Sequence, residues 1–208
     1  MTLDLWYAFV AATVVLLMIP GPTIILVLTY ALTQGRKVAV ASAAGVAFGD
    51  LIAMSASLVG IGAVVLASAT LFTAIKWVGA AYLVWMGIGM LRAAGKVEIA
   101  SAEAPALPAA RIFRNAAVVT ALNPKSIVFF VAFVPQFIVT EAALLPQFGI
   151  LIATFVGLAF VNALLYALLA DRLRGAIRQP SVLAWMTRAG GSVLIAMGVA
   201  TATLRRAA

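Results

Sequence analysis

Two charged residues lie deep inside long apolar segments, and their positions make them the best candidates for chemistry. Asp50 lies about 12 residues after its segment begins near residue 38. At 1.5 Å per helical residue this is a rise of about 18 Å, close to the middle of a hydrocarbon core roughly 30 Å thick. Lys125 is the one basic residue expected well inside a span. A charge at this depth is costly and by default marks a functional site.

Asp50 and Lys125 allow two arrangements, and the sequence leaves both open. In the first, they form a buried ion pair that is mainly structural. In the second, they line a path and bind opposite ends of a zwitterion, Asp50 the ammonium group and Lys125 the carboxylate. Asp50 is then also the candidate for proton coupling, because it is the acidic residue expected at the middle of the bilayer.

Two proline motifs are expected to break helices, and the second lies directly before Lys125: Pro20-Gly21-Pro22, about 15 residues into the first apolar segment, and Asn123-Pro124. Each proline removes a backbone donor and obstructs the preceding turn. Pro22 and Pro124 suit the first position of a new half-helix, and Asn123 suits its N-cap. Unwound backbone must face protein or a water-filled cavity, and the N–H groups that open a half-helix favour an anion such as a carboxylate. A kink that serves packing alone is the alternative.

Three further residues complete the candidate substrate site. Gly45 and Gly49 give their segment a face of small residues that lets another helix approach closely, and packing alone would also explain them. Asn162 is the counterpart of Asp50 in an internal repeat, in which residues 45–50 align with residues 157–162 at an offset of 112. Asn162 is polar at the same depth but cannot ionise.

The composition indicates that most of the chain is surrounded by lipid. Of its 208 residues, 65% are hydrophobic and 10% are charged, and the mean hydropathy is +1.18. A soluble domain is about half apolar and about a quarter charged. The chain contains no Cys and no His, which excludes disulfides, thiolate metal sites, HExxH zinc chemistry and a Ser-His-Asp triad. The sequence predicts an all-α membrane protein with six spans, near residues 5–33, 38–66, 71–91, 116–138, 146–170 and 186–204.

Basic residues predict the orientation. Three connections on one side are basic, with Arg36, Lys37, Arg92, Lys96, Arg111, Arg114, Arg172, Arg174 and Arg178, whereas the opposite loops near 67–70 and 139–145 contain no Lys or Arg. The positive-inside rule places the basic loops in the cytoplasm and both termini outside. The net charge of +8 therefore indicates membrane orientation rather than binding to nucleic acid. Asp4 and the missing cleavage site argue against a removable signal peptide.

The internal repeat predicts how the chain is divided. A second match, residues 79–87 with 190–198, has nearly the same offset, 111. We expect one three-helix unit over residues 1–91, a linker over 92–115 and a second unit over 116–208. Because each unit has three spans, the two enter the membrane from opposite sides, as in many secondary transporters. Shared apolar composition is the alternative explanation of the match.

Six motifs in this order resemble the LysE/RhtB family of amino-acid exporters, over nearly the whole chain. They are Pro20-Gly21-Pro22, Gly35-Arg36, the glycine-spaced Gly45, Gly49 and Asp50, the Lys76, Gly79, Tyr82 and Leu83 pattern, Asn123-Pro124-Lys125, and Pro135-Gln136-Phe137. The histidine that many members carry after the Gly-Asp is absent. The resemblance implies proton-driven efflux of a small amino acid or derivative through the bacterial inner membrane, by a homodimer without a cofactor.

The residues and the resemblance together predict a secondary transporter rather than an enzyme, with alternating access around a cavity at the middle of the bilayer. An exporter of metal or other cations is the main alternative, although one carboxylate without His or Cys is a poor metal site. An intramembrane enzyme is a weaker alternative. Aspartyl chemistry needs two nearby carboxylates, and Asp50 has no second one in the predicted spans. A Ser-Lys pair is improbable because Lys125 and Ser126 are adjacent on a helix and do not face each other. A purely structural membrane protein would leave Asp50 unexplained.

Overall fold

The computed structural model describes residues 1–95, 106–140, 142–177 and 179–203, and these residues form helices and no strand. The centre of the predicted linker and the last five residues of the predicted second unit lie outside the described residues. The first half contains α1 (Leu3–Met18), α2 (Pro22–Gln34), the 3₁₀ turn η1 (Arg36–Val38), α3 (Ala39–Ala67) and α4 (Ala69–Ala93). The second half contains α5 (Ala109–Ala121), α6 (Pro124–Val128), the π-helix η2 (Phe129–Phe133), the 3₁₀ helix η3 (Val134–Phe137), α7 (Leu144–Ile177) and α8 (Pro180–Thr203).

The first predicted break is confirmed. The α1 helix begins at the N-cap Thr2, whose side chain accepts a hydrogen bond from Leu5 N–H, and it ends at Met18. Gly21 is the N-cap of α2 and Pro22 is its first residue. The axes of α1 and α2 differ by 55°. Because neither proline has an amide hydrogen, the hydrogen-bond ladder of α1 cannot continue into α2.

The second predicted break is also confirmed. Asn123 is the N-cap of α6, and Pro124 is its first residue. The bend between α5 and the segment from α6 to η3 is 43°. However, α5 begins at Ala109, earlier than the start at residue 116 predicted for this span. Arg111 and Arg114 led the sequence argument to place this stretch in a loop, but both side chains are exposed on the first turns of a helix.

By length and composition, the described helices fit a protein with several membrane spans. Four of them, α3, α4, α7 and α8, are long and apolar enough to cross a membrane alone. Each of the two bent pairs also qualifies when it is taken as one span, which gives up to six. The six predicted spans correspond to these helices. The outer surface also fits a membrane protein, because large apolar side chains such as Trp77, Val78 and Trp85 on α4 are more than half exposed.

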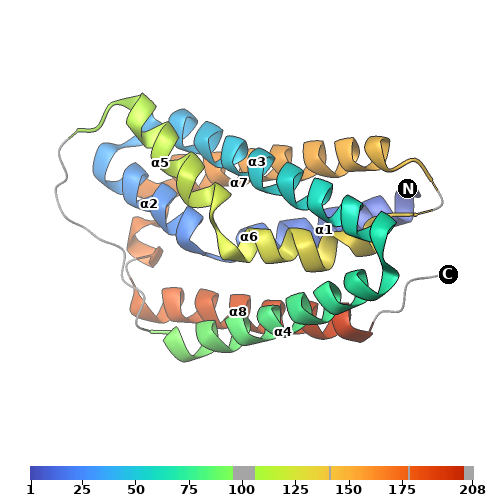
Figure 1. Ribbon diagram of the computed structural model, residues 1–208. Helices are drawn as coiled ribbons and strands as arrows, with labels where there is room; N and C mark the ends of the chain where they lie inside the picture. Colours follow the sequence, from blue (N-terminus) through green and yellow to red (C-terminus); the bar gives the residue numbers. More distant parts are fainter. Residues whose placement is uncertain (96–105, 141, 178, 204–208) are drawn as a thin grey trace.

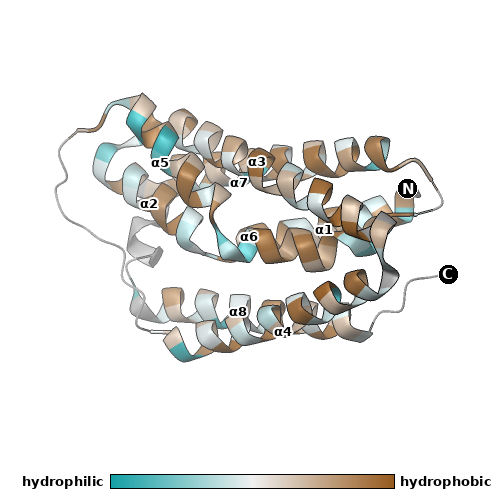
Figure 2. Cartoon of the chain, in the orientation of Figure 1, coloured by the Kyte–Doolittle hydropathy of each residue, from teal (hydrophilic) through white to brown (hydrophobic). Residues whose placement is uncertain are grey.

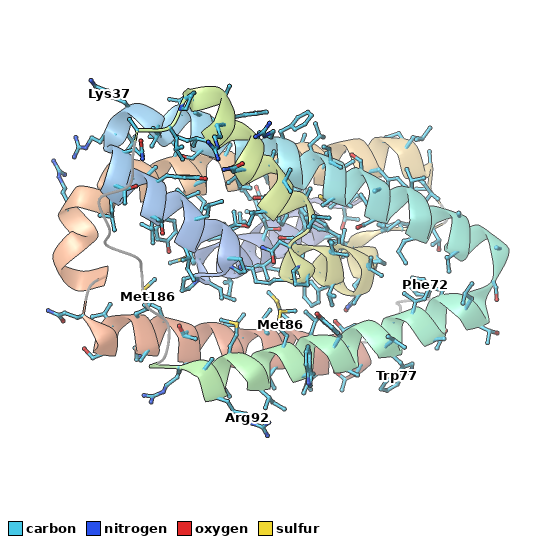
Figure 3. The ribbon with its side chains drawn as sticks, turned by 60° about the vertical axis from the view of Figure 1, so that its left-hand side comes forward. Lys37, Phe72, Trp77, Met86, Arg92 and Met186 are labelled. Atoms are coloured by element: carbon cyan, nitrogen blue, oxygen red, sulfur yellow. The ribbon has the colours of Figure 1, made fainter. Side chains whose placement is uncertain are left out.

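The helices are arranged in two layers (Figure 1). The α4 and α8 helices pack along each other in one layer, and the rest of the bundle forms the other, in which α3 packs on α5 and α7. In the α4–α8 contact, a side chain at Gly87 or Gly198 would meet the backbone of the facing helix. Figure 3 shows Trp77 projecting from α4 away from the bundle, whereas Met86 points toward the other layer.

The start of α1 and the end of α8 lie at one end of the bundle (Figure 1). The connection from α2 to α3, the last turn of α4 and the first turn of α5 lie at the opposite end. Figure 2 shows hydrophilic residues at that opposite end and also where α5 gives way to α6, in the middle of the bundle. The second of these polar regions is the place where the two broken helices meet.

Candidate functional site

The break after α1 leaves backbone carbonyl groups without helical partners. In a continuous helix the carbonyls of Leu16 and Met18 would accept from the amides of residues 20 and 22, but both of those residues are prolines. Ile19 N–H donates to Leu16 O at 3.2 Å, which tightens the last turn. A backbone carbonyl buried inside the protein costs free energy unless it finds another donor.

Side chains from the second half of the chain supply these donors. Lys125 Nζ donates to Leu16 O at 3.2 Å and to Ile19 O at 2.9 Å. On α7, Asn162 Nδ2 donates to Leu17 O at 3.1 Å, and Tyr166 Oη donates to Met18 O at 3.2 Å. A cation at the C-terminal end of a helix is also favoured by the helix dipole. The end of α1 is therefore held by α6 and α7.

The second break is joined to the first by hydrogen bonds between side chains. Asn123 Oδ1 accepts from Lys125 N–H at 3.1 Å, which caps α6, and Asn123 Nδ2 donates to Thr23 Oγ1 at 3.1 Å. Thr120 Oγ1 donates to the same Thr23 oxygen at 3.3 Å. Since Thr23 is the second residue of α2, this network fixes the start of α2 against the start of α6. The first amides of both half-helices lie in the same region.

A cavity of about 20 Å³ lies between the broken helices, α3 and α7, with room for about one water molecule. It is lined by Leu16, Leu17, Thr23, Ile24, Val46, Asp50, Asn123, Lys125, Ser126, Ala159 and Asn162. The Asp50 side chain is 2% exposed, and its Oδ1 atom is buried without a hydrogen-bond partner. The hydrogen bonds that Lys125 Nζ donates within the described residues end on carbonyl oxygens, not on Asp50.

The structure thus brings four of the predicted site residues together around one cavity: Asp50, Asn123, Lys125 and Asn162. Gly21 lies beside them, because a Cβ atom at this position would be 3.3 Å from Lys125 Nζ. The three predicted prolines, Pro20, Pro22 and Pro124, set the two breaks.

The two predicted glycines of α3 lie against α5. A Cβ atom at Gly45 would collide with the carbonyl of Phe113, and one at Gly49 would lie 2.5 Å from the carbonyl of Ala117. Neither glycine is among the residues that line the cavity. Their position brings the backbones of α3 and α5 close together, and this holds α3 and its Asp50 beside the second break.

Several residues of the site were not singled out by the sequence argument. Thr23 directly follows Pro22, so the position after this proline motif was a usable signal. Tyr166 follows Asn162 by four residues and therefore lies on the same face of α7. The carbonyl oxygens of Leu16 and Ile19 carried no signal, because every residue has one.

Side chains fill the interior toward both ends of the bundle. Toward the chain termini lie six buried aromatic rings in consecutive contact, with centroids 4.7–6.1 Å apart: Phe9, Phe129, Phe130, Phe133, Phe137 and Phe155. Toward the opposite end, Asn115 Nδ2 donates to Tyr30 Oη at 2.9 Å, and Leu107 N–H donates to Gln34 Oε1 at 2.9 Å.

The polar atoms of the site suit a small molecule with an ammonium and a carboxylate group. One carboxylate and several carbonyl oxygens are acceptors for an ammonium group, and the amides that open α2 and the ammonium group of Lys125 are donors for a carboxylate. Among the described residues there is no group of three or more Asp, Glu, His or Cys side chains that could hold a metal ion.

The chain is similar to several known proteins. The chain is 36% identical over 207 residues to the homoserine/homoserine lactone efflux protein of Salmonella typhimurium, and the match covers 100% of both chains. It is 34% identical to an uncharacterized membrane protein of Vibrio cholerae, over 99% of this chain and 100% of the relative. It is 31% identical over 137 residues to the leucine efflux protein of Klebsiella pneumoniae, which covers 66% of this chain and 65% of the relative.

No solved structure matches the chain. The model of the LysE type translocators matches residues 14–205, which include both proline breaks and all the residues that line the cavity. This agrees with the family that the six sequence motifs resemble. The chain belongs to the LysE type translocator family.

Proposed function

We propose that the protein exports a small amino acid or amino-acid derivative from the bacterial cytoplasm. The observation that carries this proposal is the Asp50 carboxyl, which lies beside a cavity at the meeting point of two broken helices and has an oxygen without a hydrogen-bond partner. An unpaired acceptor at this depth is costly unless a cationic solute uses it. The relatives named for the efflux of homoserine, homoserine lactone and leucine support the same substrate class.

In this proposal the substrate binds as a zwitterion. Asp50 accepts hydrogen bonds from the ammonium group, and the first amides of α2, with Lys125, bind the carboxylate. Asn162 and Asn123 complete the polar lining, and the breaks at Pro20, Gly21, Pro22 and Pro124 expose the backbone groups. Gly45 and Gly49 contribute through the close packing of α3 on α5.

Export is driven by the proton gradient, with Asp50 as the coupling group. The carboxylate holds either the substrate's ammonium group or a proton, but not both. Substrate binds to ionised Asp50 on the cytoplasmic side and leaves on the outer side, where Asp50 takes up a proton. The proton is released to the cytoplasm after the return step, so each substrate leaves in exchange for an entering proton.

The membrane arrangement in this proposal is an inverted repeat of residues 1–91 and 116–208, joined by residues 92–115, with both termini outside and two copies in a dimer. Three observations support the repeat: both halves begin with a proline-broken helix, Asp50 and its counterpart Asn162 line one cavity, and α4 packs on its counterpart α8. Alternating access then consists of the two halves moving about the cavity.

The proposed function is tested with purified protein in proteoliposomes. Vesicles loaded with labelled homoserine, leucine or lysine are diluted into buffer of lower pH, and efflux is measured with and without a protonophore. We expect at least one amino acid to leave faster than from vesicles without protein, with the extra rate lost when the protonophore is present. Counterflow of a divalent metal ion without counterflow of any amino acid would instead favour the cation exporter.

Alternating access predicts that the cavity opens to each side in turn, which the absence of native cysteine makes simple to test. Ala159 on α7 lines the cavity and is 0% exposed. We expect a membrane-impermeant methanethiosulfonate reagent to modify Ala159→Cys whether it is added outside or inside the vesicles. Substrate at ten times its Kd should slow the modification about tenfold, by competition for the same space.

The control for this experiment is Ala163→Cys, one turn away on α7, because Ala163 is equally buried but does not line the cavity. We expect no modification of this variant from either side. Modification of Ala159→Cys from one side only would contradict alternating access.

A further inference from the structure

We infer that the carbonyl oxygens at the end of α1 form, with Asp50, the subsite for the ammonium group of the substrate, and that Lys125 occupies this subsite when no substrate is bound. This inference rests on the proposed function and extends it. The arriving ammonium group replaces Lys125 Nζ at the carbonyls, and the released Lys125 then turns to the substrate's carboxylate. Lys125 therefore has two positions in each transport cycle.

The partners of Lys125 have the chemistry to bind a free ammonium group. Its Nζ atom donates to Leu16 O at 3.2 Å and to Ile19 O at 2.9 Å. The other two freed carbonyls, those of Leu17 and Met18, already have donors on α7. A lysine side chain and the amino group of an amino acid both end in an ammonium with three donors and no acceptor. The pair of oxygens that holds one of them has the chemistry to hold the other.

The charges around the cavity also favour an ammonium group. The cavity has one more acceptor than Lys125 uses, because Asp50 Oδ1 is buried without a hydrogen-bond partner. The C-terminal end of α1 adds the negative end of a helix dipole. Asp50 and Leu16 line the cavity, and the Ile19 carbonyl accepts from the same Lys125 Nζ atom. This carboxylate and these two carbonyl oxygens make a complete site for an ammonium group, and Lys125 fills only its carbonyl part.

The volume of the cavity is too small for an amino acid while Lys125 is in place. A cavity of about 20 Å³ holds about one water molecule, so an amino acid fits only after a side chain has moved. Lys125 is a long flexible side chain, and the neighbouring Gly21 has no side chain to block it: even a Cβ atom there would lie 3.3 Å from Nζ. Because the incoming ammonium replaces the outgoing one, Leu16 O and Ile19 O keep a donor throughout. The exchange thus avoids leaving unpaired carbonyls at the middle of the bilayer.

The experiment uses a Lys125→Ala variant and small amines as probes. With the side chain removed, ethylammonium ions should enter the vacated subsite and raise the unfolding temperature of the purified variant. Tetramethylammonium, which has the same charge but no N–H donor, should not. Neither ion should affect the wild type, in which the tethered Lys125 has a high effective concentration. Lys37→Ala, which removes an exposed lysine, is the matched control and should not respond to ethylammonium.

The second measurement separates a substrate subsite from a permanent cap on α1. We expect homoserine or leucine to compete with ethylammonium for Lys125→Ala, so that ethylammonium at ten times its Kd raises the apparent Kd of the amino acid about 11-fold. The N-acetylated amino acid, which lacks the ammonium group, should not compete. Lys125→Met keeps the apolar part of the side chain and takes the place of Lys125→Ala if the alanine variant does not fold.

Independent binding of ethylammonium and amino acid, or equal stabilisation by tetramethylammonium, would overturn the inference. Either result would leave the proposed function intact, because export by the wild type is measured separately in proteoliposomes. Loss of the wild-type export result would instead remove the proposed function itself.

Discussion

Asp50→Asn is expected to lower amino-acid export by about 30-fold or more while the protein folds normally. The substitution keeps the size of the side chain but removes its negative charge and its capacity to carry a proton. In the proposed complex, Asp50 and the substrate's ammonium group form a buried, hydrogen-bonded charge pair. Loss of one partner of such a pair costs about 2–5 kcal/mol, and each 1.4 kcal/mol is a tenfold change in affinity. The measurement is the initial rate of efflux from loaded proteoliposomes, with the unfolding temperature measured in parallel.

The matched control for this variant is Thr13→Val. Thr13 Oγ1 is the other buried oxygen on a small side chain that lacks a hydrogen-bond partner among the described residues, and Thr13 is 0% exposed. It does not line the cavity, so we expect Thr13→Val to export at the wild-type rate. Wild-type export by Asp50→Asn would remove this residue from substrate binding and from proton coupling.

The double substitution of Pro20→Ala and Pro22→Ala is expected to abolish export by joining α1 to α2. The new amides can donate to Leu16 O and Met18 O, which are the acceptors of Lys125 and Tyr166. A proline inside a helix costs about 3 kcal/mol relative to alanine, so the two substitutions favour the continuous helix by several kcal/mol. A straight helix would withdraw the freed carbonyls and the first amides of α2 from the cavity.

Two measurements check this second prediction. Export should fall to the rate of vesicles without protein, and amide hydrogen exchange over residues 16–23 should become slower than in the wild type because new helical hydrogen bonds form. Pro146→Ala is the control, because Pro146 is exposed in the first turn of α7, where proline interrupts no helix, and this variant should export normally. Normal export by the double variant, together with slow exchange, would show that the break is not needed.

Much of the fold could be predicted because its causes are local. A proline lacks an amide hydrogen wherever it lies, so both breaks were located to the residue. The long apolar segments indicate a lipid environment by their composition, whichever helices they contact. The start of α5 was wrong because a charged residue such as Arg111 can lie either in a loop or at the exposed end of a helix, and composition does not distinguish the two.

The candidate site was predicted less completely, and Lys125 shows why. Its type and depth marked it as functional, but two acceptors were considered, Asp50 and a substrate carboxylate. The structure pairs its ammonium group with carbonyl oxygens more than 100 residues away along the chain. Gly45 and Gly49 are similar: a small-residue face was evident, but its partner, α5, was not.

By itself, the sequence indicated the lipid surroundings, the places where helices must break and the charged residues inside the apolar segments. These follow from the chemistry of single residues and their order. Only the tertiary structure decided which backbone carbonyls are free, which side chain caps them and that Asp50 lacks a hydrogen bond at one oxygen. The physical reason is that every residue carries the same carbonyl group, so its need for a partner depends on the packing of distant segments rather than on residue type.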